Sequence, residues 1–295
     1  MNTAEEFEAH RPLMFSIAYR MLGSAMEAED IVHDAYLRYQ AVLPETIRSP
    51  KAFLSTIVTR LCLNQLESAR MKRKEYIGPW LPEPVLTESG VDMSADTTSL
   101  SPSQRAEMHQ SIALAFLVLL EQLTPVERAI FLLREVFDYE YAEIAEIIEK
   151  DETACRQIFS RAKKHIAENR PRFKSTQEQQ RQLLDQFMQA ANAGELDGLM
   201  KLLSDDVTLW ADGGGKARGA ALEPLHGQAA VAKFVLASTH FLTDSFTVEI
   251  VEVNGQPAAL LRVNHQTSVV VTIEIDRDHV REIRVIGNPD KLKWV

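Results

Sequence analysis

The stretch Thr124–Lys164, TPVERAIFLLREVFDYEYAEIAEIIEKDETACRQIFSRAKK, is the most strongly patterned part of this 295-residue chain. It opens on a capping box, Thr124-Pro125-Val126-Glu127, which has proline at the first helical position. Apolar residues then recur at helical spacing, and a turn signal interrupts them at Lys150-Asp151. The pattern predicts a helix from Pro125, a short helix from about Glu140 to Glu149, and a third helix from Glu152.

The last two of these helices have the spacing of a helix-turn-helix motif. Ile158, Ala162 and Ile166 point inward on the third helix, so its opposite face is polar. That face carries donors that reach phosphates and base edges in a major groove, namely Arg156, Gln157, Ser160, Arg161 and Lys164. An ordinary helical hairpin fits the same periodicity, so both interpretations stay open on the pattern alone.

Upstream, residues 1–75 also predict helices only. Ser24-Ala25-Met26-Glu27 is a capping box, and Ser49-Pro50 is a second helix start. On the helix that follows Ser24, Asp30, Asp34 and Arg38 form a polar stripe at four-residue spacing. Such a stripe is either a binding surface or an ordinary solvated face.

The helix after Pro50 leads into a basic cluster, and its polar side carries Thr56, Thr59, Arg60 and Asn64. That cluster, which could be a footprint for a nucleic-acid backbone, consists of Arg70, Lys72, Arg73 and Lys74. A solvated basic helix end is the other interpretation, because cations also stabilise a helix C-terminus.

Residues 78–105 predict a linker, because Pro and Gly punctuate a stretch that is poor in core residues. Trp80-Leu81-Pro82-Glu83-Pro84 is unusual within it, since exposed Trp and Leu are costly in water. We expect this segment to rest on a neighbouring domain, either as a local anchor or as a contact that matters for function.

From about residue 175 the pattern changes to α+β. Leu183–Leu203 predicts two helices broken at Asn192-Ala193-Gly194, and Gln228–Ser238 predicts another. Alternation of period two then marks strands, which are separated by turns at Asn254-Gly255 and Arg277-Asp278.

Composition sets outer bounds on the protein class. With 45% apolar and 25% charged residues the chain is an ordinary globular protein, and its net charge is −10. The acidic N-terminus and the absence of a long apolar run predict a cytoplasmic protein without a membrane span. Cys62 and Cys155 lack zinc-site spacing, so we expect no disulfide, no metal and no cofactor.

Two motifs in the helical part resemble those of bacterial sigma factors. Residues 29–38, EDIVHDAYLR, resemble the polymerase-binding helix, and residues 133–145, LREVFDYEYAEIA, resemble region 4 of the extracytoplasmic-function group. The chain is further similar to the subgroup with a C-terminal SnoaL-like domain in three short motifs: WLPEP at 80–84, DGGGK at 212–216 and NPDKL at 288–292. The resemblance therefore covers essentially the whole length.

The resemblance implies a multi-domain fold. Two all-α sigma domains, the second a helix-turn-helix, would precede an α+β SnoaL-like cone with a mixed, mainly antiparallel sheet. The expected parts are a region 2 domain at 1–77, a linker at 78–105, a region 4 domain at 106–174 and the SnoaL-like domain at 175–295. One feature departs from many family members, which carry Gly before the helix-turn-helix turn and small residues after it. Here Glu149, Lys150 and Glu152 occupy those positions.

The resemblance also implies an alternative sigma factor whose partners are core RNA polymerase, through its β and β′ subunits, and promoter DNA. Region 2 would bind the polymerase through Asp30, His33, Asp34 and Arg38. It would open the minus-ten element with the help of Arg60, Asn64, Arg70, Lys72 and Arg73, while the outward face of the helix from Glu152 reads the minus-thirty-five element.

The tail would act as a built-in regulator of the sigma domains. The residues expected to form its regulatory contacts are Trp80, Leu81, Pro82, Glu83, Pro84, Asp212, Gly213, Gly214, Gly215, Lys216, Asn288, Pro289, Asp290, Lys291 and Leu292. If the linker docks near residues 212–216 and 288–292, the tail can limit how the two sigma domains are arranged. Its pocket could also hold a small-molecule ligand.

Two alternatives remain from the sequence. SnoaL-like domains include enzymes, and the titratable candidates for acid or base work are Asp212, His226, His240 and His265. We expect no catalytic residue, because a single His near a strand is more often structural. A ligand-responsive helix-turn-helix regulator would leave residues 1–77 without a role.

Overall fold

The structure is a computed structural model that describes residues 3–42, 47–87, 112–169, 176–239 and 246–295. Contacts divide the chain into two compact units. Unit 1 comprises Met1–Lys74 and Gly90–Arg170, and unit 2 comprises Glu75–Ser89 and Pro171–Val295. Both helical parts therefore fall in unit 1, while the first part of the expected linker falls with the tail. None of the helices in the described ranges is both long and apolar enough to cross a membrane.

Unit 1 begins with three helices, α1 (Thr3–Leu22), α2 (Ala25–Gln40) and α3 (Pro50–Lys74). The Ser24 hydroxyl accepts a hydrogen bond from the Glu27 backbone N–H at 3.1 Å, which starts α2 where the sequence predicted. The predicted apolar face of α2 is buried, with Ile31, Val32 and Tyr39 among its members. The helix after Pro50 differs from expectation at Thr59, which is fully buried although it was placed on the polar side.

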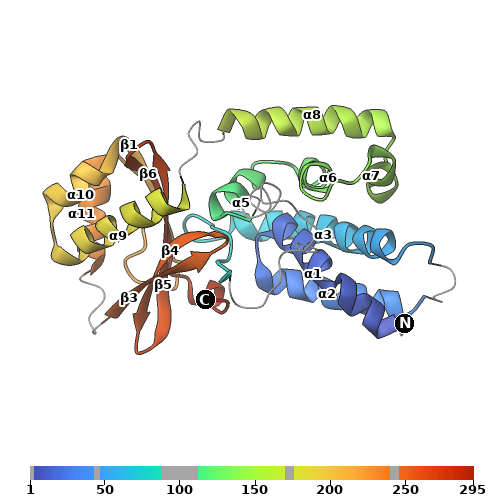
Figure 1. Cartoon of the computed structure of the whole chain (residues 1–295), viewed down its shortest axis with the longest axis horizontal. Helices are drawn as coiled ribbons and strands as arrows, with labels where there is room; N and C mark the ends of the chain where they lie inside the picture. Colours follow the sequence, from blue (N-terminus) through green and yellow to red (C-terminus); the bar gives the residue numbers. More distant parts are fainter. Residues whose placement is uncertain (1–2, 43–46, 88–111, 170–175, 240–245) are drawn as a thin grey trace. The chain divides into compact units, whose positions relative to one another are not determined.

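The second part of unit 1 contains α5 (Leu114–Leu120), α6 (Pro125–Glu135), α7 (Tyr141–Ile148) and α8 (Glu152–Asn169), labelled in Figure 1. The predicted capping box at the start of α6 is present, with Thr124 and Glu127 bonding each other's backbone N–H. Ile130, Ile144, Ile147 and Cys155 pack in one core that joins α6, α7 and α8. The helix-turn-helix predicted from the sequence is thereby formed.

Unit 2 is a six-stranded sheet with helices. Its elements are α9 (Gln177–Ala193), α10 (Leu196–Leu202), β1 (Leu203–Asp212), β2 (Leu225–His226), α11 (Gln228–Thr239), β3 (Phe246–Val253), β4 (Gln256–Val263), β5 (Gln266–Asp276), β6 (His279–Ile286) and the 3₁₀ turn η3 (Pro289–Lys291). The strand order is β2-β1-β6-β5-β4-β3. Only the β1–β6 pair among these strands is parallel, which confirms a mixed and mainly antiparallel sheet.

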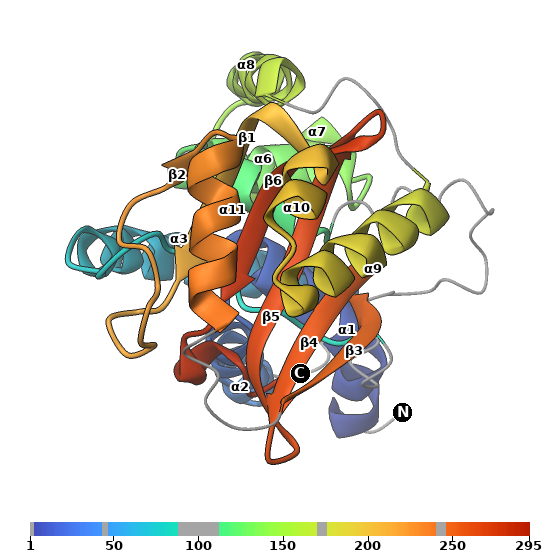
Figure 2. The ribbon, with the colours of Figure 1, turned by 90° about the vertical axis from the view of Figure 1, so that its left-hand side faces the viewer.

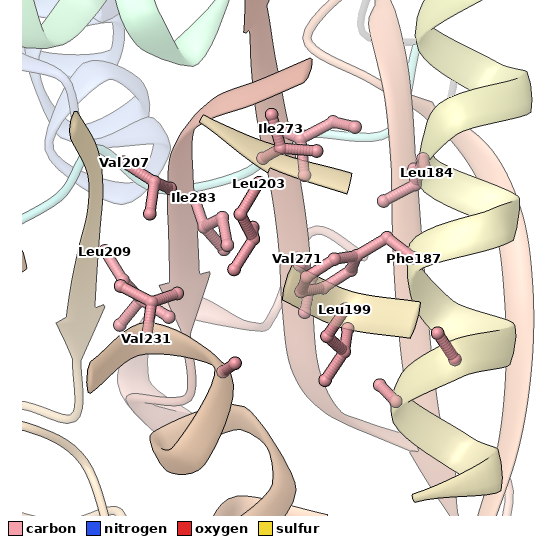
Figure 3. Packing of buried hydrophobic residues seen from close by; sticks show 14 of the residues in the cluster. Leu184, Phe187, Leu199, Leu203, Val207, Leu209, Val231, Val271, Ile273 and Ile283 are labelled. Carbon is pink, nitrogen blue, oxygen red and sulfur yellow. The ribbon is translucent and has the colours of Figure 1, made fainter. Parts of the chain in front are cut away.

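The three helices α9, α10 and α11 cover one face of this sheet, as Figure 2 shows. Alternate strand residues meet them, so that Val207 and Leu209 of β1 and Ile283 of β6 lie in the same core. Figure 3 shows Phe187 of α9 and Leu199 of α10 directed at Val271 within this cluster. The period-two pattern read from the sequence is therefore the core-facing side of the strands, and β1 ends with Asp212 at the edge of this packing.

Candidate linker-anchoring and nucleic-acid sites

A buried carboxylate at the end of β1 gathers three donors. Asp212 is 1% exposed, and its Oδ2 accepts hydrogen bonds from the Leu81 backbone N–H at 2.8 Å and from Lys291 Nζ at 2.7 Å. The hydroxyl of Tyr76 donates to Oδ1 of the same carboxylate. A buried charge requires such pairing, because desolvation of an unpaired ion costs several kcal/mol.

Lys291, in η3, is the counter-ion and is itself only 6% exposed. Its Nζ also donates to the backbone carbonyl of Leu81, so the aspartate and the lysine together bind both backbone polar groups of this linker residue. The ammonium lies 4.2 Å from the centre of the Trp80 ring and 5.0 Å from that of Tyr76. These cation–π contacts supply favourable charge interactions where water is excluded.

Asn288 ties the C-terminal motif to the same place. Its side-chain N–H donates to the Tyr76 hydroxyl at 2.8 Å, and its backbone N–H donates to the Asp212 carbonyl at 3.0 Å. Burial, followed by the hydrogen bond to Asp212, raises the pKa of Tyr76 well above its usual value. The phenol therefore stays protonated and can serve as a donor. We call Tyr76, Trp80, Leu81, Asp212, Asn288 and Lys291 the linker-anchoring cluster.

The glycine turn after β1 lets the linker approach the cluster. Gly214 has φ +56°, and a side chain there would overlap the Asn288 amide and lie 2.9 Å from the Tyr76 hydroxyl. Gly215 has φ +71°, and a Cβ there would lie 2.8 Å from Cδ1 of Ile77. Both positions thus require glycine for conformation and for space.

The linker continues along the turn between β3 and β4. The Val85 backbone N–H donates to Asn254 Oδ1 at 3.0 Å, and the Asn254 backbone N–H donates back to the Val85 carbonyl at 2.9 Å. Leu86 forms an isolated antiparallel bridge with Val253. Leu81 and Val85 are 2% and 1% exposed, so the linker buries apolar side chains that would be costly in water.

The structure brings together most of the residues expected to form regulatory contacts. Trp80, Leu81, Asp212, Asn288 and Lys291 belong to the cluster, and Gly214 and Gly215 make room for it. The remaining members are the buried Pro82, Glu83, Pro84 and Leu292, the turn residue Gly213, and the exposed Pro289, Lys216 and Asp290. The last two form an ion pair at 2.5 Å outside the buried part.

Sequence reasoning missed Tyr76, Val85 and Asn254. Tyr76 was grouped with the preceding helices, and Asn254 was interpreted only as half of a turn. The local signal at Asn254 was the turn dipeptide that it forms with Gly255. This dipeptide is consistent with the φ of +53° at Asn254, but it does not indicate the hydrogen bond from Asn254 to the linker.

A second buried ion cluster lies on the sheet of unit 2. Arg284 contacts Glu274 at 3.8 Å and Glu282 more closely, and its guanidinium lies 5.6 Å from the centre of the Trp210 ring. Burial raises the pKa of Glu274 to about 7, Arg284 opposes that rise, and Glu282 adds to it.

Of the titratable groups considered for catalysis, the three that the structure describes do not share a site. Asp212 is held in its ion pair, whereas His226 shares a hydrogen bond of 3.1 Å with Thr208 across β1 and β2. His265 lies exposed in the turn between β4 and β5, and His240 lies outside the described residues. Within the described ranges, no group of three His, Cys, Asp or Glu could hold a metal ion, and Cys62 and Cys155 are buried free thiols.

In unit 1, the outer face of α8 is exposed along its length. The side chains on this face are Arg156, Gln157, Ser160, Arg161 and Lys164. Arg156 pairs with Glu152 at 2.7 Å and lies 4.6 Å from the centre of the Tyr141 ring, which orients its guanidinium before any ligand binds.

The predicted nucleic-acid residues of α3 differ from one another. Asn64 is exposed, whereas Arg60 is turned toward α7 and donates to the carbonyls of Ile147 and Glu146, at 3.0 Å each. The side chains of Arg70, Lys72 and Arg73 lie outside the part that the structure describes.

On α2, the residues expected to bind the polymerase are all exposed, namely Asp30, His33, Asp34 and Arg38. Leu37 lies among them and is 51% exposed. Sequence analysis did not single out this exposed apolar side chain.

Comparison with known proteins agrees with this architecture. The chain matches the family models Sigma-70 region 2 over residues 7–71 and Sigma-70, region 4 over residues 113–166. The ECF RNA polymerase sigma factor SigJ of Mycobacterium tuberculosis is 37% identical over 233 residues, which cover 78% of this chain and 71% of SigJ. The probable ECF sigma factor SigI of the same organism is 30% identical over 97% of this chain and 93% of its own length. The crystal structure of M. tuberculosis SigJ superposes with a TM-score of 0.72 at 31% identity, covering 99% of this chain and 98% of that one.

Proposed function

The chain belongs to the extracytoplasmic-function RNA polymerase sigma factors, and on that premise we propose that its C-terminal SnoaL-like unit regulates the sigma domains through the linker. As an alternative sigma factor, the protein binds core RNA polymerase and directs initiation at specific promoters. The observation that carries the proposal is the buried Asp212–Lys291 pair, which binds both the backbone N–H and the backbone carbonyl of Leu81.

This anchorage has a mechanical consequence. The linker joins the two helical parts of unit 1, and its first part lies within Glu75–Ser89, which belongs to unit 2. A chain fixed at Leu81 and Val85 has less freedom to extend between the two helical parts than a free chain. The tail therefore selects among arrangements of the sigma domains, and a signal that loosens the anchor shifts their population.

Each sigma domain has an assigned surface within this proposal. The exposed stripe of α2 with Asp34, Leu37 and Arg38 binds the β and β′ subunits of core polymerase in the cytoplasm. Asn64 with the basic end of α3 holds the opened strand, and the outer face of α8 reads duplex DNA. Arg156 is the base reader, and Lys164 contacts phosphate.

The reading face can be tested by two substitutions on α8. Arg156→Ala should cost roughly 1–3 kcal/mol of promoter binding and relax sequence preference. Lys164→Ala should weaken binding to all sequences alike and flatten its salt dependence. Equal, sequence-blind losses at both positions would mean that the reading face is misassigned.

The regulatory claim is tested by run-off transcription with core polymerase and a promoter library. Full-length protein, Trp80→Ala and a chain truncated after residue 174 are compared at matched polymerase occupancy. Truncation should change transcript yield markedly, and Trp80→Ala should reproduce part of the change because it removes the ring beside Lys291. Three indistinguishable yields would overturn the regulatory role.

We propose that the tail works by binding and not by catalysis. Asp212 is enclosed by Tyr76, Leu81 and Lys291, and His226 and His265 occupy different parts of the sheet. A small molecule in the tail would then act as a signal that changes the strength of the linker anchor. Turnover of such a molecule by the purified chain would contradict this part of the proposal.

A further inference from the structure

Arg60 connects α3 to the end of α7 through one side chain. Its Nε donates to the Ile147 carbonyl and its Nη2 to the Glu146 carbonyl, both at 3.0 Å. The last carbonyls of a helix have no partner within the helix, and the helix dipole favours a cation there. The guanidinium thus caps the C-terminus of α7, the first helix of the helix-turn-helix.

Glu149 completes this arrangement at a conformational cost. It follows α7 with φ +57° and ψ +47°, a left-handed conformation that glycine adopts without strain and that other residues avoid. Its Oε1 lies 3.0 Å from Arg60 Nη2. A strained residue at the helix-turn-helix turn therefore provides the carboxylate that meets the arginine of α3. We call Arg60, Glu149 and the two carbonyls of α7 the Arg60 clasp.

Further polar contacts join the two helical parts of unit 1. The hydroxyls of Ser55 and Tyr139 share a buried hydrogen bond of 2.5 Å. Arg128 of α6 donates to the Met21 carbonyl of α1 at 2.6 Å. Interfaces between domains that separate are more polar than permanent ones, because their surfaces must also be stable in water.

We propose that the Arg60 clasp is an autoinhibitory latch that opens when the Arg60 guanidinium exchanges its α7 partners for a nucleic-acid phosphate. The clasp and a side-on phosphate contact exclude each other, because both use the Nε and Nη2 donors of Arg60. Closure holds the helix-turn-helix against α3, and promoter DNA competes for the same side chain. The phosphate part of this latch rests on the proposed function, whereas closure by Glu149 does not.

Closure is tested by a matched pair of charge reversals in the full-length protein. Glu149→Lys places a cation against Arg60, while Glu146→Lys makes the same charge change on α7 and leaves its backbone carbonyl in place. Spin labels on cysteines introduced at the exposed Ser68 of α3 and Ala167 of α8 report the distance between the two parts. The native Cys62 and Cys155 are buried, so the introduced thiols take the label.

We expect Glu149→Lys to shift the distance distribution to longer and broader values, and Glu146→Lys to keep that of the parent. Circular dichroism should show equal helicity for both variants. Unchanged distances in Glu149→Lys, or equal shifts in the two variants, would overturn the latch.

Competition with phosphate is tested by adding a single-stranded DNA of mixed sequence to the same labelled proteins. DNA should move the parent distribution toward that of Glu149→Lys. Glu149→Lys should also bind the DNA about two- to fivefold more tightly than Glu146→Lys, the factor expected for loss of one partly exposed ion pair. If the two charge-reversal variants differ in their spin-label distances while DNA shifts none of the distance distributions, closure by Glu149 holds and the assignment of Arg60 to DNA is wrong.

Discussion

Replacing Asp212 by Asn tests the linker-anchoring cluster most sharply. Three donors converge on the carboxylate, from Tyr76, Leu81 and Lys291. An amide has one acceptor oxygen, so at least one donor would face its NH₂ group, and the Lys291 charge would lose its counter-ion while buried. Breaking a buried ion pair from one side costs about 3–5 kcal/mol. We expect the lower end, about 3 kcal/mol, because Lys291 keeps the Leu81 carbonyl and two aromatic rings.

Tryptophan fluorescence measures this loss in unit 2 alone. The chain has three tryptophans, Trp80, Trp210 and Trp294, and all belong to unit 2. With a urea slope of about 2 kcal/mol/M, a loss of 3 kcal/mol lowers the unfolding midpoint by about 1.5 M.

Asp290→Asn is the matched control for this substitution. It removes the same charge from the exposed pair with Lys216, whose two side chains are more than half exposed, and should cost about 0–1 kcal/mol. Equal midpoint shifts in Asp212→Asn and Asp290→Asn would refute the view that burial of the Asp212 pair holds the linker.

Three further outcomes are expected. Gly214→Ala should lower the free energy of unfolding of unit 2, followed by tryptophan fluorescence, by at least about 1 kcal/mol, since its Cβ would overlap Asn288 at a positive φ. An unchanged free energy of unfolding would contradict the packing of the turn. Glu274→Gln should stabilise unit 2 by up to about 3 kcal/mol at pH 8 and by little at pH 4.5. The reason is that a carboxyl whose pKa is raised to about 7 contributes stability below its unfolded pKa, and this stability is lost as the pH rises through 7. A gain in stability that does not depend on pH would show another cause. Reversing the charges of Asp34 and Arg38 together should weaken capture by core polymerase at constant helicity, and undiminished capture would refute the role of α2.

Local signals in the sequence predicted most elements of the fold. Ser24 and Thr124 are capping residues whose partners lie three positions away, so their helix starts are legible in the chain itself. Alternation identified the strands, and the cost of exposing Trp80 predicted that the linker rests on protein. Such inferences succeed because the cause and its effect are close in sequence.

The details of the sites depend on partners distant in sequence. Tyr76 bonds Asp212 across 136 positions, and Arg60 bonds Ile147 across 87, so no local pattern reports either contact. Arg60 was predicted to contact nucleic acid because it lies on a polar face of its helix. That pattern could not reveal that the Arg60 side chain binds carbonyls of α7 in the structure. Likewise, the positive φ of Glu149 depends on the turn between α7 and α8.

The most direct measurement of the central claim is transcript yield from one promoter, with Asp212→Asn and Asp290→Asn compared with the parent chain at equal polymerase occupancy. The temperature and urea-free buffer are chosen so that unit 2 stays folded in all three proteins. If the tail controls the sigma domains through the buried linker anchor, Asp212→Asn changes the yield and Asp290→Asn matches the parent. Equal yields from all three proteins, with the anchor demonstrably weakened in Asp212→Asn, would contradict the account.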